Sequence, residues 1–159
     1  MLELRPYERE DAATILSWSK GEEAFYKWTA GVLGDYPLTP EQFEQVNSLK
    51  PFTMVDEGEI VGFFTLRKPA DTEGVLRFGF VVVDPEKRGK GYGKRMLLLG
   101  IDAAKKLGAK KVSLGVFENN RPAYYCYKAA GFQDVLQETP ELYHVLGQEW
   151  SCLELERDI

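Results

Sequence analysis

Hydrophobic residues along the chain follow two different periods, which divide it into predicted strands and helices. Runs with the alternation or β-branched content of strands lie at residues 2–5, 52–55, 60–66 and 75–83. Asp56-Glu57-Gly58-Glu59 separates the second run from the third and is a hairpin turn signal. The last three runs are therefore expected to form antiparallel strands in series.

Helical signals occupy the segment between the first and second strands. Asp11 is placed to cap a helix that runs to Ser19, and residues 24–28 continue as an aromatic-rich helix or turn. Thr39-Pro40-Glu41-Gln42 combines an N-cap, a proline at the first helical position and a capping box. This helix is expected to end before Pro51, because proline disfavours helical backbone at the residue before it.

After residue 83, helices and strands alternate. Predicted helices cover residues 91–107 and 122–130, each followed by a glycine, and predicted strands cover residues 112–117, 132–136 and 149–155. A strand–helix–strand succession requires a right-handed crossover between parallel strands. The order β-α-α-α-β-β-β-α-β-α-β-β predicts one α/β domain spanning residues 1–159. Its mixed antiparallel and parallel sheet should have about seven strands, flanked by about four or five helices.

Charge is distributed unevenly over these elements. The formal net charge is −5, yet residues 84–128 carry four acids and eleven bases. Residues 1–50 carry nine acids and five bases, and residues 129–159 carry seven acids and one base. An acidic chain lacks the broad positive face that duplex nucleic acid requires, so no nucleic-acid partner is expected. One confined basic island instead suits a small polyanion.

The remaining composition points to an ordinary globular protein. No apolar run approaches the roughly 18 residues of a membrane span, and the first residues lack a signal-peptide pattern, so no membrane partner and a cytoplasmic location are expected. Cys126 and Cys152 have no paired metal-ligand spacing and are expected to be buried small hydrophobic residues, with no metal bound. His144 is interpreted as a surface or packed residue near a turn.

Residues 87–95, Lys-Arg-Gly-Lys-Gly-Tyr-Gly-Lys-Arg, hold the strongest chemical signal, with five bases and three glycines in nine residues. Glycines let backbone N–H groups converge on one point, and the following helix N-terminus adds free donors, so the segment suits phosphate oxygens. A Walker A loop is excluded because Arg95, not Ser or Thr, follows Gly93-Lys94. A dinucleotide fingerprint requires a different glycine spacing. A solvated, glycine-rich helix cap is the alternative without a ligand.

Two segments resemble the GNAT superfamily of N-acetyltransferases. Arg88-x-x-Gly91-x-Gly93, between a strand and a helix, is similar to the family's pyrophosphate-binding motif. Residues 120–132 are similar to its second coenzyme A segment, matching at Asn120, Ala123, Tyr127, Gly131 and Phe132.

The resemblance implies acetyl-CoA as the acyl donor and a V-shaped splay between the two central strands. It implies that coenzyme A contacts Val81, Val82, Val83, Arg88, Gly89, Lys90, Gly91, Tyr92, Gly93, Lys94, Asn120 and Ala123. It also implies that Tyr127 is the general acid that protonates the leaving thiolate. A backbone N–H near Val81 or Val82 would serve the developing oxyanion.

The general base is left open. The family's glutamate on the strand before the glycine loop is absent from Arg77-Phe78-Gly79, and the alternative glutamate on the next strand is replaced by Gly115. The remaining candidates are Glu118, Glu73, Asp71, Glu23 and Glu22, or a chain of water molecules. A catalytically inactive module that binds coenzyme A to regulate another process is therefore an alternative to an enzyme.

The acceptor is expected to be a cationic primary amine, because the family's acceptor regions correspond to the acidic ends of this chain. Six aromatic residues are candidates to line its pocket or to pack the core: Trp18, Phe25, Tyr26, Trp28, Tyr36 and Phe43. The N-terminal Leu-Arg-Pro-Tyr segment resembles the branch that acetylates ribosomal-protein N-termini. Polyamines, aminoglycosides, amino acids and protein N-termini stay open, as do the acyl length and a monomeric or homodimeric state.

Overall fold

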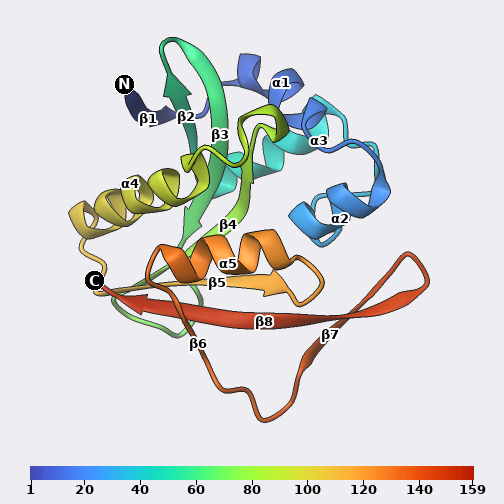
Figure 1. The fold of residues 1–159 in the computed structure, drawn as a ribbon, viewed down its shortest axis with the longest axis vertical. Coiled ribbons are helices and arrows are strands. Elements are labelled where there is room, and N and C mark those ends of the chain that lie inside the picture. The colour runs from blue at the N-terminus through green and yellow to red at the C-terminus, as the bar shows by residue number, and fades with distance from the viewer.

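The computed structural model describes residues 1–159 and contains one eight-stranded sheet with helices on both of its faces (Figure 1). The strands are β1 Leu2–Pro6, β2 Lys50–Asp56, β3 Glu59–Arg67, β4 Val75–Val83, β5 Lys111–Phe117, β6 Gln133–Asp134, β7 Glu141–Val145 and β8 Gln148–Asp158. The α-helices are α1 Ala12–Ser17, α2 Glu22–Thr29, α3 Pro40–Phe43, α4 Tyr92–Lys106 and α5 Arg121–Ala129. No helix combines the length and the apolarity needed to cross a membrane.

The sheet has the predicted mixed topology. Its strand order is β1-β2-β3-β4-β5-β8-β6, and β7 pairs with the remaining part of β8. The first four strands are antiparallel in series, and the β4–β5 pair, joined through α4, is parallel. The predicted α/β class and the hairpin at residues 56–59 are confirmed.

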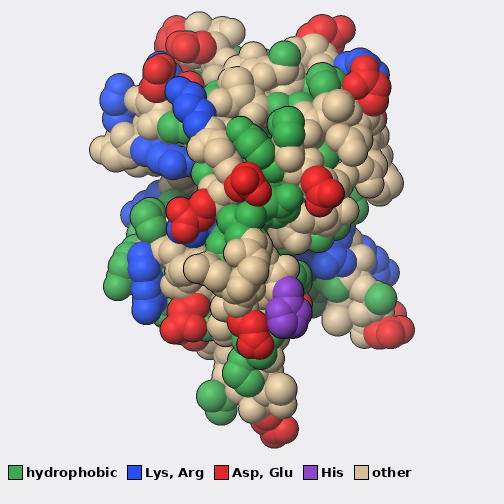
Figure 2. All heavy atoms as spheres, turned by 90° about the vertical axis from the view of Figure 1, so that its right-hand side faces the viewer, with side chains coloured by type: hydrophobic (Ala, Val, Ile, Leu, Met, Phe, Trp, Pro, Cys, Tyr) green, Lys and Arg blue, Asp and Glu red, His purple; other side chains and the backbone are tan.

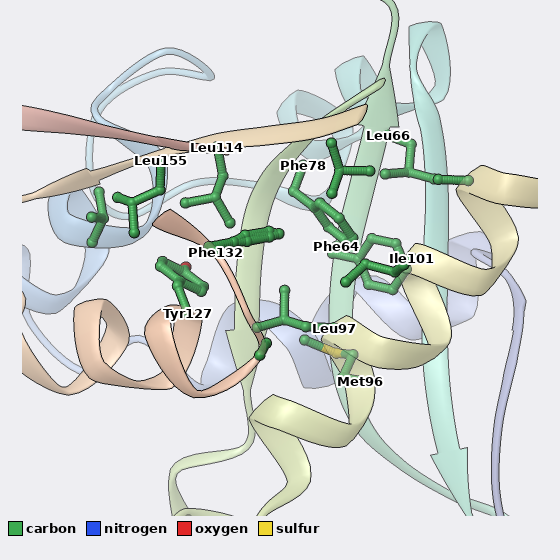
Figure 3. Close-up of a cluster of buried hydrophobic side chains, with 14 of the residues drawn as sticks. Phe64, Leu66, Phe78, Met96, Leu97, Ile101, Leu114, Tyr127, Phe132 and Leu155 are labelled. Atoms are coloured by element: carbon green, nitrogen blue, oxygen red, sulfur yellow. The ribbon is translucent and has the colours of Figure 1, made fainter. Parts of the chain in front are cut away.

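Both faces of the sheet are buried, which explains the near-continuous apolar run in β3. Phe64 points into a cluster of 17 buried residues that lies under α4 and α5, part of which is drawn in Figure 3. Its neighbour Phe63 points into a second cluster, formed with the N-terminal helices on the opposite face. Both phenylalanines have 0% exposure, so the sheet is the middle layer of the molecule.

The two central strands separate along most of their length. Parallel pairing joins only Val75 to Lys111, Leu76 to Val112 and Arg77 to Ser113. Beyond these pairs β4 and β5 diverge, as Figure 1 shows. A register shift between β3 and β4 accompanies a positive φ of 50° at Phe80, which is the signature of a β-bulge. The predicted V-shaped splay is therefore present, with its closed end at Arg77.

The N-terminal helices differ in detail from the prediction. Asp11 does not cap α1 with its side chain, because its carboxylate accepts hydrogen bonds from Arg5 at 2.8 Å and from the Glu8 N–H at 2.9 Å. Helix α1 ends at Ser17. The Thr39 capping box is confirmed, but α3 is one turn long and gives way to a 3₁₀ segment at residues 44–48.

The C-terminal segment holds one strand more than predicted. The expected strand at residues 132–136 is reduced to β6, and β7 pairs antiparallel with β8 through a turn at Leu146-Gly147, where both residues have positive φ. Strand β7 has mostly exposed side chains, so it carries no hydrophobic period. His144, expected near a turn, is an exposed residue of this strand (Figure 2).

Candidate functional site

The loop between β4 and α4 presents a row of free backbone donors. Gly89 and Gly91 have φ values of 79° and 80°, which side chains rarely adopt. The N–H groups of residues 89–94 donate to no acceptor in the chain, and the first helical bond runs from the Arg95 N–H to the Gly91 carbonyl at 3.1 Å. A Cβ added at either glycine would meet no atom within 4 Å. The loop is therefore an open concave site for an anion.

Cationic side chains surround these donors without being neutralised. Arg88, Lys90 and Lys94 are exposed, and no salt bridge engages them. Tyr92 is different, because its hydroxyl donates to Asp56 Oδ2 at 2.6 Å and this bond lowers the pKa of Asp56. The Tyr92 side chain thus ties α4 to the β2–β3 hairpin, and only its backbone N–H faces the anion site.

The two predicted coenzyme A segments meet in the structure. A Cβ at Gly93 would lie 2.9 Å from Cys126 Sγ of α5 and 4.0 Å from Val83 Cγ2 of β4. Gly93 is thus required for close packing of α4 on α5. Asn120 is the N-cap of α5 through its backbone carbonyl, and its side-chain amide makes no hydrogen bond in the chain. Ala123 is half-buried one turn into the same helix.

Tyr127 lies in the apolar wall beside the V. Its side chain is 7% exposed, and Figure 3 shows its ring among Leu114, Phe132 and Leu155. No hydrogen bond in the chain engages its hydroxyl, and burial raises the pKa of Tyr127, so the phenol stays protonated at neutral pH. By contrast, the Tyr124 hydroxyl donates to Asp134 Oδ2 at 2.8 Å. Tyr125 is 63% exposed and therefore lies outside the core.

The open edge of β4 offers further donors. The Asp84 N–H donates to Val61 O at 3.0 Å across the β3 side. Because N–H directions alternate along a strand, those of Val83 and Val81 point to the other side, into the V. Val81 and Val83 pack on the α4–α5 side, and Val82 is buried on the opposite face. The Phe80 carbonyl accepts a hydrogen bond from Trp28 Nε1 at 2.8 Å, which joins α2 to the bulge.

None of the five acidic candidates for a base lies within the V. Asp71 and Glu73 precede the closed end of β4, while Glu22 and Glu23 are exposed at the start of α2. Glu118 is exposed beyond the end of β5. A carboxylate that the sequence did not single out lies closer, since Glu154 of β8 forms an ion pair with Arg77 at the closed end of the V. Glu154 can be recognised as a candidate only from the register of β8 on β5.

The aromatic residues of the N-terminal helices mostly form core. Trp18, Phe25 and Phe43 are at most 6% exposed in the cluster under these helices. The Tyr36 N–H donates to the Tyr26 hydroxyl at 3.1 Å, and the Tyr36 hydroxyl accepts from the Gly21 N–H at the same distance. A pocket of about 340 Å³ opens beside them, and its lining includes Lys20, Phe25 and Tyr36. Tyr26 and Trp28 are partly buried, and Trp28 contacts β4 at Phe80.

Comparison with known proteins agrees with this geometry. The family model described as "Acetyltransferase (GNAT) family" matches residues 11–132. An uncharacterized N-acetyltransferase, YycN, of Bacillus subtilis is 33% identical over 82 residues, which are 50% of this chain and 52% of that protein. The chain thus spans about half the length of this relative.

Solved structures share the whole fold. A spermidine N-acetyltransferase from Vibrio cholerae, in complex with CoA and spermine, superposes with a TM-score of 0.81 at 19% identity, covering 99% of this chain and 95% of that one. A ribosomal-protein-alanine N-acetyltransferase from Brucella melitensis superposes with a TM-score of 0.76 at 16% identity, covering 99% of each chain. With the family model matching most of its length, this chain belongs to the GNAT acetyltransferase family.

Proposed function

We propose that the protein transfers an acetyl group from acetyl-CoA to a cationic primary amine. The observation that carries the proposal is the row of free N–H groups at residues 89–94, placed at the open end of the V between β4 and β5. A pyrophosphate fits this loop because it needs several converging donors, open space and nearby positive charge. All three are present around Gly89 and Gly91.

Different residues of the chain bind different parts of the coenzyme. In the proposal, backbone N–H groups of residues 89–94 hold the pyrophosphate, and Arg88, Lys90 and Lys94 add attraction that weakens with salt. The unpaired edge at Val81–Val83 receives the pantetheine arm as an added strand would, and Asn120 and Ala123 line its other side. The free side-chain amide of Asn120 supports this role.

The same arrangement suits acyl transfer by direct attack. The N–H of Val81 points into the V, where it can donate to the acyl oxygen as negative charge develops there. Tyr127 donates its phenol proton to the departing sulfur, and its burial keeps that proton in place at neutral pH. Both groups belong to rigid, packed elements, so they need no rearrangement.

A cationic acceptor is favoured by exposed acidic residues near the tips of α2 and the β7–β8 hairpin, among them Glu22, Glu23 and Glu149. Figure 2 shows acidic side chains around exposed hydrophobic ones on the side of the molecule that carries the tips of α2 and the β7–β8 hairpin. The Vibrio cholerae neighbour was crystallised with spermine, a polycation. Polyamines are therefore the first acceptor class to test.

Calorimetry with acetyl-CoA tests the donor, with NAD and ATP as controls and two salt concentrations. We expect binding of acetyl-CoA alone, weakened by salt. Release of thiol is then followed with spermidine, kanamycin, tyramine, lysine and a peptide beginning with alanine. Preference for NAD, or no binding of acetyl-CoA, would overturn the proposal.

The alternative function is an inactive module that binds coenzyme A. The lack of a carboxylate in Arg77-Phe78-Gly79 and the glycine at position 115 favour it. The two functions separate in one assay, because a module binds acetyl-CoA but releases no thiol with any of the five amines.

A further inference from the structure

The acceptor amine must approach the V from the face opposite the donor. Helices α4 and α5, with the residue 89–94 loop, cover the face on which Leu114 and Val116 of β5 are buried. Because side chains alternate along a strand, Gly115 lies on the other face. Phe78 of β4 is buried under α4 and α5, so Arg77 and Gly79 lie on the other face as well. The acceptor face of the V is thus lined by two glycines just beyond its closed end.

An arginine occupies the space that these glycines leave. A Cβ at Gly115 would lie 2.9 Å from Arg77 Nη2. The guanidinium of Arg77 crosses β5 above this glycine and donates from Nη1 to Glu154 Oε2 at 2.7 Å, with Ser113 Oγ at 3.3 Å. Gly115 is therefore the residue that allows a side chain of β4 to reach a carboxylate of β8.

Glu154 stands next to the position where the family glutamate is missing. In the β5–β8 register it is directly opposite Gly115, so the two residues share a face. The side chains of Arg77 and Glu154 are 22% and 25% exposed, which leaves the pair accessible at the floor of the acceptor face. Glu154 Oε1 makes no hydrogen bond in the chain, so one oxygen is anchored and the other is free.

The surroundings of the pair are acidic and aromatic. Glu141 of β7 lies on the same face, opposite Cys152 in register, and accepts a hydrogen bond from the Tyr143 hydroxyl at 2.7 Å. Burial of the Arg77 guanidinium acts to lower its pKa, but the hydrogen bond to Glu154 and the charge of Glu154 outweigh burial and raise the pKa. Arg77 therefore stays positively charged. Four titratable groups on the packed elements face Glu154: Arg77, Glu141, Tyr143 and Cys152. Two residues further along β8, Glu156 is paired with Lys111 of β5.

We propose that Glu154 is the carboxylate that accepts the proton of the acceptor amine, and that Arg77 is the positioning residue that holds it at the V. The ammonium form of the acceptor first releases one proton to solvent, which frees the nitrogen lone pair. As this nitrogen attacks the acetyl carbon, the C–N bond forms and the C–S bond breaks. The nitrogen's proton passes to Glu154 Oε1, and the sulfur takes the proton of Tyr127. Glu154 then returns its proton to solvent and Tyr127 recovers one. This assignment rests on the proposed function.

The test compares Glu154→Gln with a matched control on the same strand and face. Glu156→Gln also removes a carboxylate that is paired with a base, Lys111 at 3.2 Å, but it lies opposite Ser113, where β4 and β5 are still joined. With the fastest acceptor of the five amines, we expect Glu154→Gln to lower kcat/KM by about 10²-fold or more. Acetyl-CoA affinity should be unchanged, and Glu156→Gln should behave like the unmodified protein.

The pH profile separates chemistry from structure. Loss of Glu154 should remove the acidic limb of kcat/KM that the carboxylate sets, leaving the limb of the amine itself. Arg77→Met should keep that limb but lower kcat, because Arg77 no longer holds the carboxylate at the V. If Glu154→Gln fails to fold, Glu154→Asp, which withdraws the carboxylate by one methylene, should lower kcat while acetyl-CoA still binds.

The outcomes are distinguishable. If no amine is acetylated by the unmodified protein, the proposed function fails. If the unmodified protein is active and Glu154→Gln matches Glu156→Gln in rate and pH profile, the assignment of Glu154 is wrong while the proposed function stands.

Discussion

Replacing Tyr127 with phenylalanine should lower activity without lowering stability. The hydroxyl makes no hydrogen bond in the chain, and the ring, in a residue that is 7% exposed, packs in a cluster of apolar side chains, so removing the oxygen breaks no bond within the protein. The substitution keeps the ring, which packs against Phe132 at 6.3 Å between centroids. We therefore expect the free energy of unfolding to stay unchanged or to rise by up to about 1 kcal/mol.

Activity should respond in the opposite direction. Loss of the proton donor should reduce kcat by about 10²-fold or more while the affinity for acetyl-CoA stays near that of the unmodified protein. Tyr124→Phe is the matched control on the same helix, since it removes a hydroxyl that is bonded to Asp134. Its expected effects are a loss of at most about 1 kcal/mol of stability and no change in kcat.

Urea unfolding and steady-state kinetics give both quantities on the same preparations. A loss of more than about 1 kcal/mol in Tyr127→Phe would mean that the hydroxyl has a stabilising partner. Unchanged kcat at saturating substrates would remove Tyr127 from the mechanism.

Burial of Tyr127 should also make the free energy of unfolding depend on pH. Because burial raises the pKa of Tyr127, its neutral form contributes stability below the unfolded pKa of about 10, and that contribution is lost at higher pH. In Tyr127→Phe this loss should be absent.

Three further substitutions test other parts of the structure. Gly93→Val should lower the unfolding midpoint in urea, because its Cβ would lie 2.9 Å from Cys126 Sγ and force α4 away from α5. Asp11→Asn should cost about 2–4 kcal/mol at neutral pH, since it leaves the Arg5 guanidinium without its carboxylate. Burial of the Asp11 carboxyl acts to raise its pKa, but its hydrogen bonds, first that from Arg5, outweigh burial and lower the pKa. The difference in stability between the two proteins should therefore shrink as pH falls below about 4, and a difference that stays constant would contradict the pairing. Lys90→Gln should weaken acetyl-CoA binding and flatten its salt dependence in calorimetry, and an unchanged salt slope would place the phosphates elsewhere.

Local sequence was sufficient wherever one segment carries its own structural signal. The loop at residues 87–95 was identified because glycine and lysine spacing determines both the backbone turn and the charge. Helices α4 and α5 and strands β2 to β5 followed from hydrophobic period and turn residues. The parallel β4–β5 pair followed from the handedness of the crossover.

Only the tertiary structure decided which side chains share the acceptor face. Strand β7 has no apolar period and exists because β8 is long enough to pair with three strands, β5, β6 and β7. Asp11 was expected to cap a helix but instead forms an ion pair with Arg5, because a buried carboxylate is stabilised most by a nearby cation. Arg77 and Glu154 are 77 positions apart, and nothing in either neighbourhood marks them as partners. Their contact depends on the register of β8 and on the missing side chain at Gly115, and both are properties of packing between distant segments rather than of any local pattern.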